Sequence, residues 1–127
     1  MKEIDSLREQ LEKTTQGEYD DISVDDVFKR LYVEDDSRGI SKTRAHSLLM
    51  HANIKTIGDG RGKTACDLLN ICYSGIDTCA IIIVVFEHYG VNIEIPNFGG
   101  HKLVLRQNLH LITEAVAEYR NKIIYKD

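Results

Sequence analysis

The amino-acid sequence predicts an all-α fold, because apolar residues recur at spacings of three and four along most of the chain. Serine, threonine and aspartate, which favour helix starts, precede several of these segments, and glycines interrupt them. The length of 127 residues and the single proline fit one compact helical domain, and 43% of the residues are hydrophobic.

The first third of the chain is predicted to form two helices joined by a polar loop. Three apolar residues of the first helix, over residues 2–13, share one face: Ile4, Leu7 and Leu11. Ser23 can cap a second helix over about residues 24–32, whose first turn carries two aspartates. Residues 1–38 contain 12 acidic and 6 basic residues, a balance of −6, so we expect an acidic helical arm.

The middle of the chain is predicted to contain two short helices separated by a glycine-rich turn. Ser41 can cap the first of them. Its inner face carries four apolar residues: Ala45, Leu48, Leu49 and Ala52. Thr64 can cap the second helix, with Asp67 at its third position. The inner face of that helix repeats the spacing: Ala65, Leu68, Leu69 and Cys72.

Residues 78–89 are ambiguous, because the run 79–86 is continuously apolar and β-branched, which by itself favours a buried strand. Pro96 excludes a helix interior in the loop that follows. A last helix over 104–122 has apolar residues at alternating steps of four and three: Leu105, Leu109, Ile112, Val116 and Tyr119. This stripe is short for a coiled coil and is expected to pack within the molecule.

Charge and cysteine usage limit the function classes. The net charge of −4 has the wrong sign for a protein that coats nucleic acid without specificity. No apolar run reaches the roughly 18–20 residues of a membrane span, and the charged N-terminus is unlike a secretory signal. Three cysteines without metal or redox spacing indicate reduced thiols: Cys66, Cys72 and Cys79. We therefore expect a cytoplasmic protein with no membrane partner.

Residues 40–91 follow the order helix, glycine-containing turn, short helix, hairpin, helix. The residues that carry this pattern are Ile40–Ala45 with Leu48, Asn53–Asp59, Lys63–Thr64 with Asp67–Leu69, Gly75, and Tyr89–Val91. This stretch resembles the C-terminal domain of the bacterial RNA polymerase alpha subunit, a compact domain with helix-hairpin-helix character. The resemblance implies a helix at 78–89 and a core domain over 39–91. Residues 92–127 are then expected to form a loop and a helix that packs on this core.

The resemblance also implies docking to AT-rich DNA through the first helix and the hairpin. The residues expected to contact DNA are Lys42, Thr43, Arg44, His46, Gly75 and Thr78. Thr43 stands where the family has its key arginine, and Asp77 stands where it has a basic residue. A carboxylate repels phosphate, so weak DNA binding is expected. Four cations form either a small basic patch or scattered surface charges: Lys42, Arg44, Arg61 and Lys63.

Other chemistries have weaker support in the sequence. Residues 58–64 look like a phosphate-binding loop, but three residues separate the first glycine from Gly-Lys-Thr where the motif needs four. His46 and His51 are five positions apart, unlike the spacing of a zinc-binding helix. No arrangement of side chains argues for a catalytic nucleophile. We therefore predict no catalytic residue, metal or cofactor.

The sequence thus predicts a non-enzymatic, transcription-associated adaptor that binds DNA or a protein through its core, with the acidic arm modulating that contact. The expected partners are AT-rich DNA, RNA polymerase or a transcription regulator, and a second copy in a homodimer. The alternative is a protein-interaction or oligomerisation module on the same scaffold that has lost DNA binding. A small enzyme acting on a phosphate ligand through residues 58–64 is a remote third class.

Overall fold

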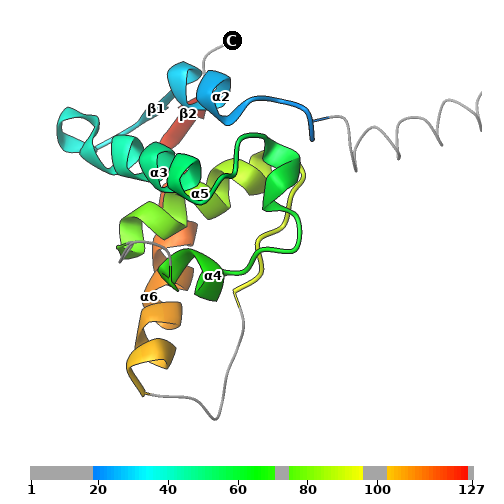
Figure 1. The fold of residues 1–127 in the computed structure, drawn as a ribbon. Helices are drawn as coiled ribbons and strands as arrows, with labels where there is room; N and C mark the ends of the chain where they lie inside the picture. The colour runs from blue at the N-terminus through cyan, green and yellow to red at the C-terminus, as the bar shows by residue number, and fades with distance from the viewer. Residues whose placement is uncertain (1–18, 71–74, 96–102, 126–127) are drawn as a thin grey trace, which may run out of the picture.

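The computed structural model describes residues 19–70, 75–95 and 103–125, and it is mostly helical with one small sheet (Figure 1). Its described α-helices are α2 (Val24–Arg30), α3 (Ile40–His51), α4 (Ala65–Asn70), α5 (Ile76–His88) and α6 (Leu103–Tyr119). The strands are β1 (Leu31–Val33) and β2 (Ile123–Tyr125), and two 3-10 turns are η1 (Ser37–Gly39) and η2 (Ile57–Gly60).

The mostly helical class is confirmed, but the sheet was not predicted. The helix predicted over 2–13 lies outside the described residues.

Helix α5 is the centre of the molecule. Every residue from Thr78 to Phe86 is buried, and α3, α4 and α6 all pack against this helix. The segment is therefore helical despite its β-branched composition, because tertiary packing outweighs the intrinsic preference of the residues. A helix that is apolar on every side must be covered on every side, and three neighbouring helices provide that cover.

Helix α6 supplies the apolar stripe that the sequence predicted. Leu109, Ile112 and Val116 are buried, and α6 packs along α5. The expectation of packing within the molecule is confirmed for this part of the helix. The helix ends at Tyr119, three residues before the predicted end, and the chain then enters β2.

The second helix is shorter than predicted because its last two residues belong to a strand. Helix α2 ends at Arg30, and β1 pairs antiparallel with β2. The register places Leu31 opposite Tyr125 and Val33 opposite Ile123. This ribbon joins the first and last thirds of the chain, and one buried cluster includes residues from Val24 to Ile123. The core thus draws on all three of the segments that the sequence predicted.

The start of α3 is capped by a different residue from the one predicted. Gly39 occupies the N-cap position, and the Asp36 carboxylate accepts hydrogen bonds from the amides of Ser41 (2.9 Å) and Lys42 (3.0 Å). The prediction that Ser41 caps this helix is therefore wrong. Arg38 and Gly39 have φ angles of 60° and 69°, and this left-handed turn brings the aspartate back over the first amides.

The predicted cap of α4 is confirmed. The Thr64 amide donates to the Asp67 carboxylate at 2.9 Å, and the Asp67 amide donates to Thr64 Oγ1 at 3.3 Å. This reciprocal pair is a capping box, which depends only on residues three positions apart. Ser23 occupies the N-cap position of α2 but makes no side-chain hydrogen bond there.

Candidate functional site

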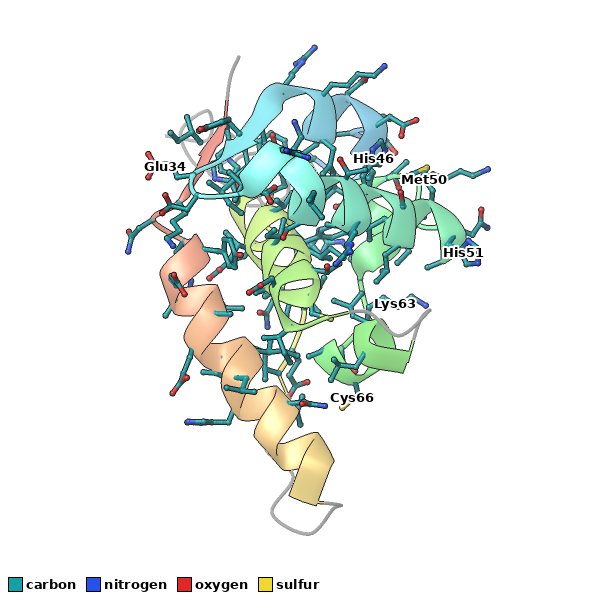
Figure 2. All side chains as sticks on the ribbon, turned by 90° about the vertical axis from the view of Figure 1, so that its left-hand side faces the viewer. Glu34, His46, Met50, His51, Lys63 and Cys66 are labelled. Carbon is teal, nitrogen blue, oxygen red and sulfur yellow. The ribbon has the colours of Figure 1, made fainter. Side chains whose placement is uncertain are left out.

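The predicted contact helix, α3, has a buried side and an exposed side. Ala45, Leu48 and Leu49 face the core. The residues exposed on the other side are Ile40, Thr43, Arg44, Ser47 and His51. Figure 2 shows His46, Met50 and His51 along the length of this helix. Four of the six predicted DNA contacts lie on α3, so their exposure determines what the face can bind.

Lys42 is engaged within the molecule. Its Nζ donates a hydrogen bond of 2.7 Å to the carbonyl oxygen of Leu31 in β1. Its side chain is therefore directed along the edge of the ribbon, where it satisfies a strand carbonyl. A lysine held in this way is less available for a phosphate group than one that extends into solvent.

His46 is also held by its own chain. Its Nε2 pairs with the carboxylate of Asp25 in α2, and its ring lies parallel to the Phe28 ring, with the centroids 5.4 Å apart. Both partners belong to the segment that the sequence assigned to the acidic arm. Helix α2 therefore occupies the imidazole of His46 directly, while the modulating role expected of the arm stays a prediction.

The remaining predicted contacts divide between surface and interior. Thr43 and Arg44 are exposed, and Gly75, the N-cap of α5, is exposed as well. Thr78 is 6% exposed in the first turn of α5, so its hydroxyl has little access to an external ligand. The sequence alone does not show that this hydroxyl is buried, because its burial depends on the helices that pack around α5.

Carboxylates lie at the starts of both α3 and α5. Asp36 caps α3, and Asp77 is the second residue of α5. Burial raises the pKa of Tyr119, and the charge of Asp77, a hydrogen bond to Asp77 and the charge of Asp36 raise it further. The phenol of Tyr119 therefore senses both carboxylates, Asp77 more than Asp36, and the charge of Glu118 on its own helix as well.

The proposed basic patch is reduced to two free cations. Arg61 forms a two-point ion pair with Asp20, with both N–O distances at 2.8 Å, and Lys42 is engaged as described. Arg44 and Lys63 are exposed and have no ion-pair partner within the described part of the chain. Two cations provide less attraction for a phosphate backbone than a cluster of four.

The glycine-rich segment 58–64 packs against its own chain. A Cβ atom at Gly58 would lie 2.8 Å from the Cβ of Asp20, and one at Gly60 would overlap the buried Phe86 ring. Close approach of neighbouring chain segments therefore explains both glycines. The segment begins inside the 3-10 turn η2, not after the buried strand that a phosphate-binding loop requires.

A small cavity on the opposite end of α5 was not predicted from the sequence. It has a volume of about 190 Å³ and is lined by Val84, Glu87, His88, Arg120 and Tyr125. The rings of His88 and Tyr125 stack with centroids 3.7 Å apart, and Arg120 forms a two-point ion pair with Glu87. Burial lowers the pKa of His88 and raises that of Tyr125. No short sequence signal links these residues, because they come from three separate segments.

Comparison with known proteins gives no match to a family model, a curated protein or a solved structure. Within the described residues, no helix combines the length and apolar character needed to span a bilayer. The same residues contain no group of three or more histidine, cysteine, aspartate or glutamate side chains arranged to hold a metal ion.

Proposed function

We propose that this protein is a non-enzymatic interaction module that uses the outer face of α3 to bind another protein. The proposal relies on the resemblance of residues 40–91 to the C-terminal domain of the RNA polymerase alpha subunit. From that resemblance it takes a transcription regulator or RNA polymerase as the class of partner. DNA binding is weak or lost on this scaffold. The observation that carries the proposal is the pair of carboxylates, Asp36 and Asp77, at the starts of α3 and α5.

Electrostatics supports a protein partner over DNA. A phosphate that approaches the start of α3 meets the Asp36 carboxylate, which already accepts hydrogen bonds from the first free amides. Two unit charges of the same sign 4 Å apart repel by roughly 4 kcal/mol near a protein surface. One arginine, Arg44, would have to overcome this repulsion, because Lys42 and His46 have partners inside the molecule.

The composition of the outer face also fits a protein. Ile40 is 47% exposed and lies within one turn of Arg44. Arginine is among the residues that most often dominate binding energy in protein interfaces, and the neighbouring apolar side chain of Ile40 adds surface that a partner can bury. The remaining exposed positions of the face, Thr43, Ser47 and His51, can add polar contacts around them.

Weak docking to DNA is the second candidate, and the exposure of Thr43, Arg44 and Gly75 favours it. We expect the unmodified protein to bind an AT-rich duplex more weakly than about 100 µM at physiological salt, which is the weak limit of non-specific binding. The Asp36→Asn/Asp77→Asn variant should bind more tightly, since asparagine is close to aspartate in size and removes both charges. At position 36 it keeps one of the two backbone hydrogen bonds, because its Nδ2 cannot accept. The measurement is a fluorescence-anisotropy titration at two salt concentrations.

Arg44→Ala provides the control for that titration, because it should abolish any binding gained by the double variant. Lys29→Ala, a change of an exposed cation on α2, should leave it unchanged. Micromolar, salt-sensitive binding by the unmodified protein that disappears in Arg44→Ala would overturn the proposal in favour of DNA docking.

A capture experiment tests the protein-binding face directly. A protein retained by the immobilised chain should be lost with Ile40→Glu/Arg44→Glu, because this variant removes the apolar side chain and reverses the cation. Leu111→Glu/Lys63→Glu makes the same change in charge at another exposed apolar residue and another free cation, and should retain the partner. Equal retention by both variants would exclude the outer face of α3 as the binding surface.

A further inference from the structure

Two exposed apolar side chains lie directly opposite each other on the β1–β2 ribbon. Tyr32 is 51% exposed and Ile124 is 44% exposed, and the register pairs them across the two strands. Their neighbours along the strands, Leu31, Val33 and Ile123, are buried, because successive side chains point to opposite faces. An antiparallel ribbon with one solvated face normally carries polar residues on that face. The exposed pair therefore marks the outer face of the ribbon as a surface on which a partner can bury apolar area.

Opposite charges flank this apolar pair along the chain. Arg30 ends α2 two positions before Tyr32, and Glu34 follows Tyr32 by two positions. Both charged side chains are exposed, and neither forms an ion pair with another residue that the structure describes. The Glu34 amide extends the ladder by donating to the Lys122 carbonyl oxygen at 2.8 Å, so Glu34 shares the outer face with Tyr32. Figure 2 shows Glu34 at the outer edge of the molecule, beside the ribbon.

We propose that the outer face of the ribbon binds the same face of a second copy, in a dimer whose two-fold axis crosses the strands at the pair of Tyr32 and Ile124. A two-fold interface brings one patch against itself, so the charges of the patch must complement themselves after a half turn. An axis across the strands reverses the direction of β1. It therefore places Arg30 of each copy opposite Glu34 of the other, with the apolar pairs stacked between them.

A two-fold axis along the strands is less favourable. It would place Glu34 opposite Lys122 of the second copy, because these two residues lie across from each other in the ladder. The Lys122 ammonium already pairs with the carboxylates of Glu118 at 2.6 Å and Asp35 at 3.4 Å. The axis across the strands uses Arg30 instead, and thus adds two ion pairs without disturbing an existing one. Complementary charges of this kind fix the register of an interface.

The short strands limit the strength of this association. Each strand has three residues, so the interface is smaller than the roughly 1,600 Å² of a standard protein complex, and we expect a weak dimer. The dimer uses none of the α3 residues proposed above for a protein partner, so it is independent of that proposed function.

Sedimentation equilibrium of the full chain up to about 1 mM tests the association, and we expect the mean mass to rise from that of a monomer towards that of a dimer. Tyr32→Thr/Ile124→Thr should weaken it by about tenfold or more, because threonine suits a strand but removes apolar area. Leu111→Gln and Ile40→Glu/Arg44→Glu change exposed residues on other elements and should have less than about a twofold effect. A monomer at every concentration would overturn the proposal, as would a dimer that only the α3 variant disrupts.

A charge exchange tests the two-fold arrangement. Arg30→Glu and Glu34→Arg each set like charges opposite each other at two places in the dimer, and each should weaken association by about tenfold or more. Arg30→Glu/Glu34→Arg restores opposite charges and should return the dissociation constant to within about threefold of that of the unmodified protein. Lys63→Glu makes the same change in net charge as Arg30→Glu, away from the ribbon, and serves as the control.

Circular dichroism of each variant verifies that it is folded before its mass is measured. Failure of the folded Arg30→Glu/Glu34→Arg variant to recover association would overturn the proposed arrangement, and so would an equal loss in Lys63→Glu.

Discussion

Replacing Gly60 with alanine is expected to lower the free energy of unfolding by about 3 kcal/mol, near the upper end for overpacking of a well-packed core. The new Cβ atom would overlap two ring carbons of Phe86, which is fully buried in α5. A surface side chain could rotate away, but this ring is enclosed by other core residues. Glycine-to-alanine changes without a clash usually stabilise by about 0.4–1 kcal/mol, so the sign of the effect depends on the overlap.

Chemical denaturation of the purified variant measures this loss, with Gly75→Ser as the control. Gly75 has open space at the position of a Cβ atom and is the N-cap of α5, where serine is favoured. The control should therefore change stability by less than about 0.5 kcal/mol, the usual range for surface substitutions. An equal loss in both variants would mean that the ring of Phe86 is not the cause.

The clash can be isolated by a double-mutant cycle. Phe86→Leu removes the ring and should itself cost about 1–2 kcal/mol. In that background Gly60→Ala should cost less than about 1 kcal/mol, because the overlapping atoms are gone, giving a coupling energy above 1 kcal/mol. Additive losses would contradict the packing of Gly60 against Phe86.

Aspartate substitutions at Ile81, Ile82 and Ile83 are expected to prevent folding, whichever of the three positions is changed. Three consecutive residues point in three directions around a helix, about 100° apart. In an amphipathic helix at least one of these directions faces solvent and tolerates a charge. All three side chains are buried here, at 0%, 0% and 4% exposure, so each carboxylate would enter an apolar environment. An unpaired buried charge costs more than about 4 kcal/mol, which is comparable to the whole stability of many domains.

Circular dichroism and gel filtration distinguish these variants from the folded protein. Glu87→Gln is the control on the same helix, because Glu87 is exposed and its pair with Arg120 is a surface interaction. A surface ion pair contributes about 0–1 kcal/mol, so this control should remain folded. A folded protein from any one of the three aspartate variants would contradict the central position of α5.

Local sequence patterns predicted several elements correctly. Thr64 and Asp67 form the expected capping box, and the inner residues Leu48 and Leu49 of α3 are buried as their spacing predicted. Each of these features depends on residues within one or two helical turns. The helix at α5 was predicted from the resemblance to a known family, because its own β-branched residues favour a strand.

The candidate site was less predictable, because its residues depend on distant partners. Lys42 and His46 were expected to face a ligand, but Leu31, Asp25 and Phe28 engage them. The carboxylate of Asp36 caps α3, a role that the sequence pattern assigned to Ser41. A single sequence shows that a lysine, histidine or aspartate is present, but not which neighbour it meets after the chain folds.

The sequence by itself determined where most helices lie and which of their sides is apolar, since periodicity and caps are properties of one or two turns. Tertiary structure decided that Val33 pairs with Ile123, 90 positions away (123 − 33 = 90), and that Thr78 is buried while Arg44 is exposed. The physical reason is the range of the interactions. Helical spacing and capping act between near neighbours, whereas burial and side-chain pairing arise only when distant segments pack around the same core.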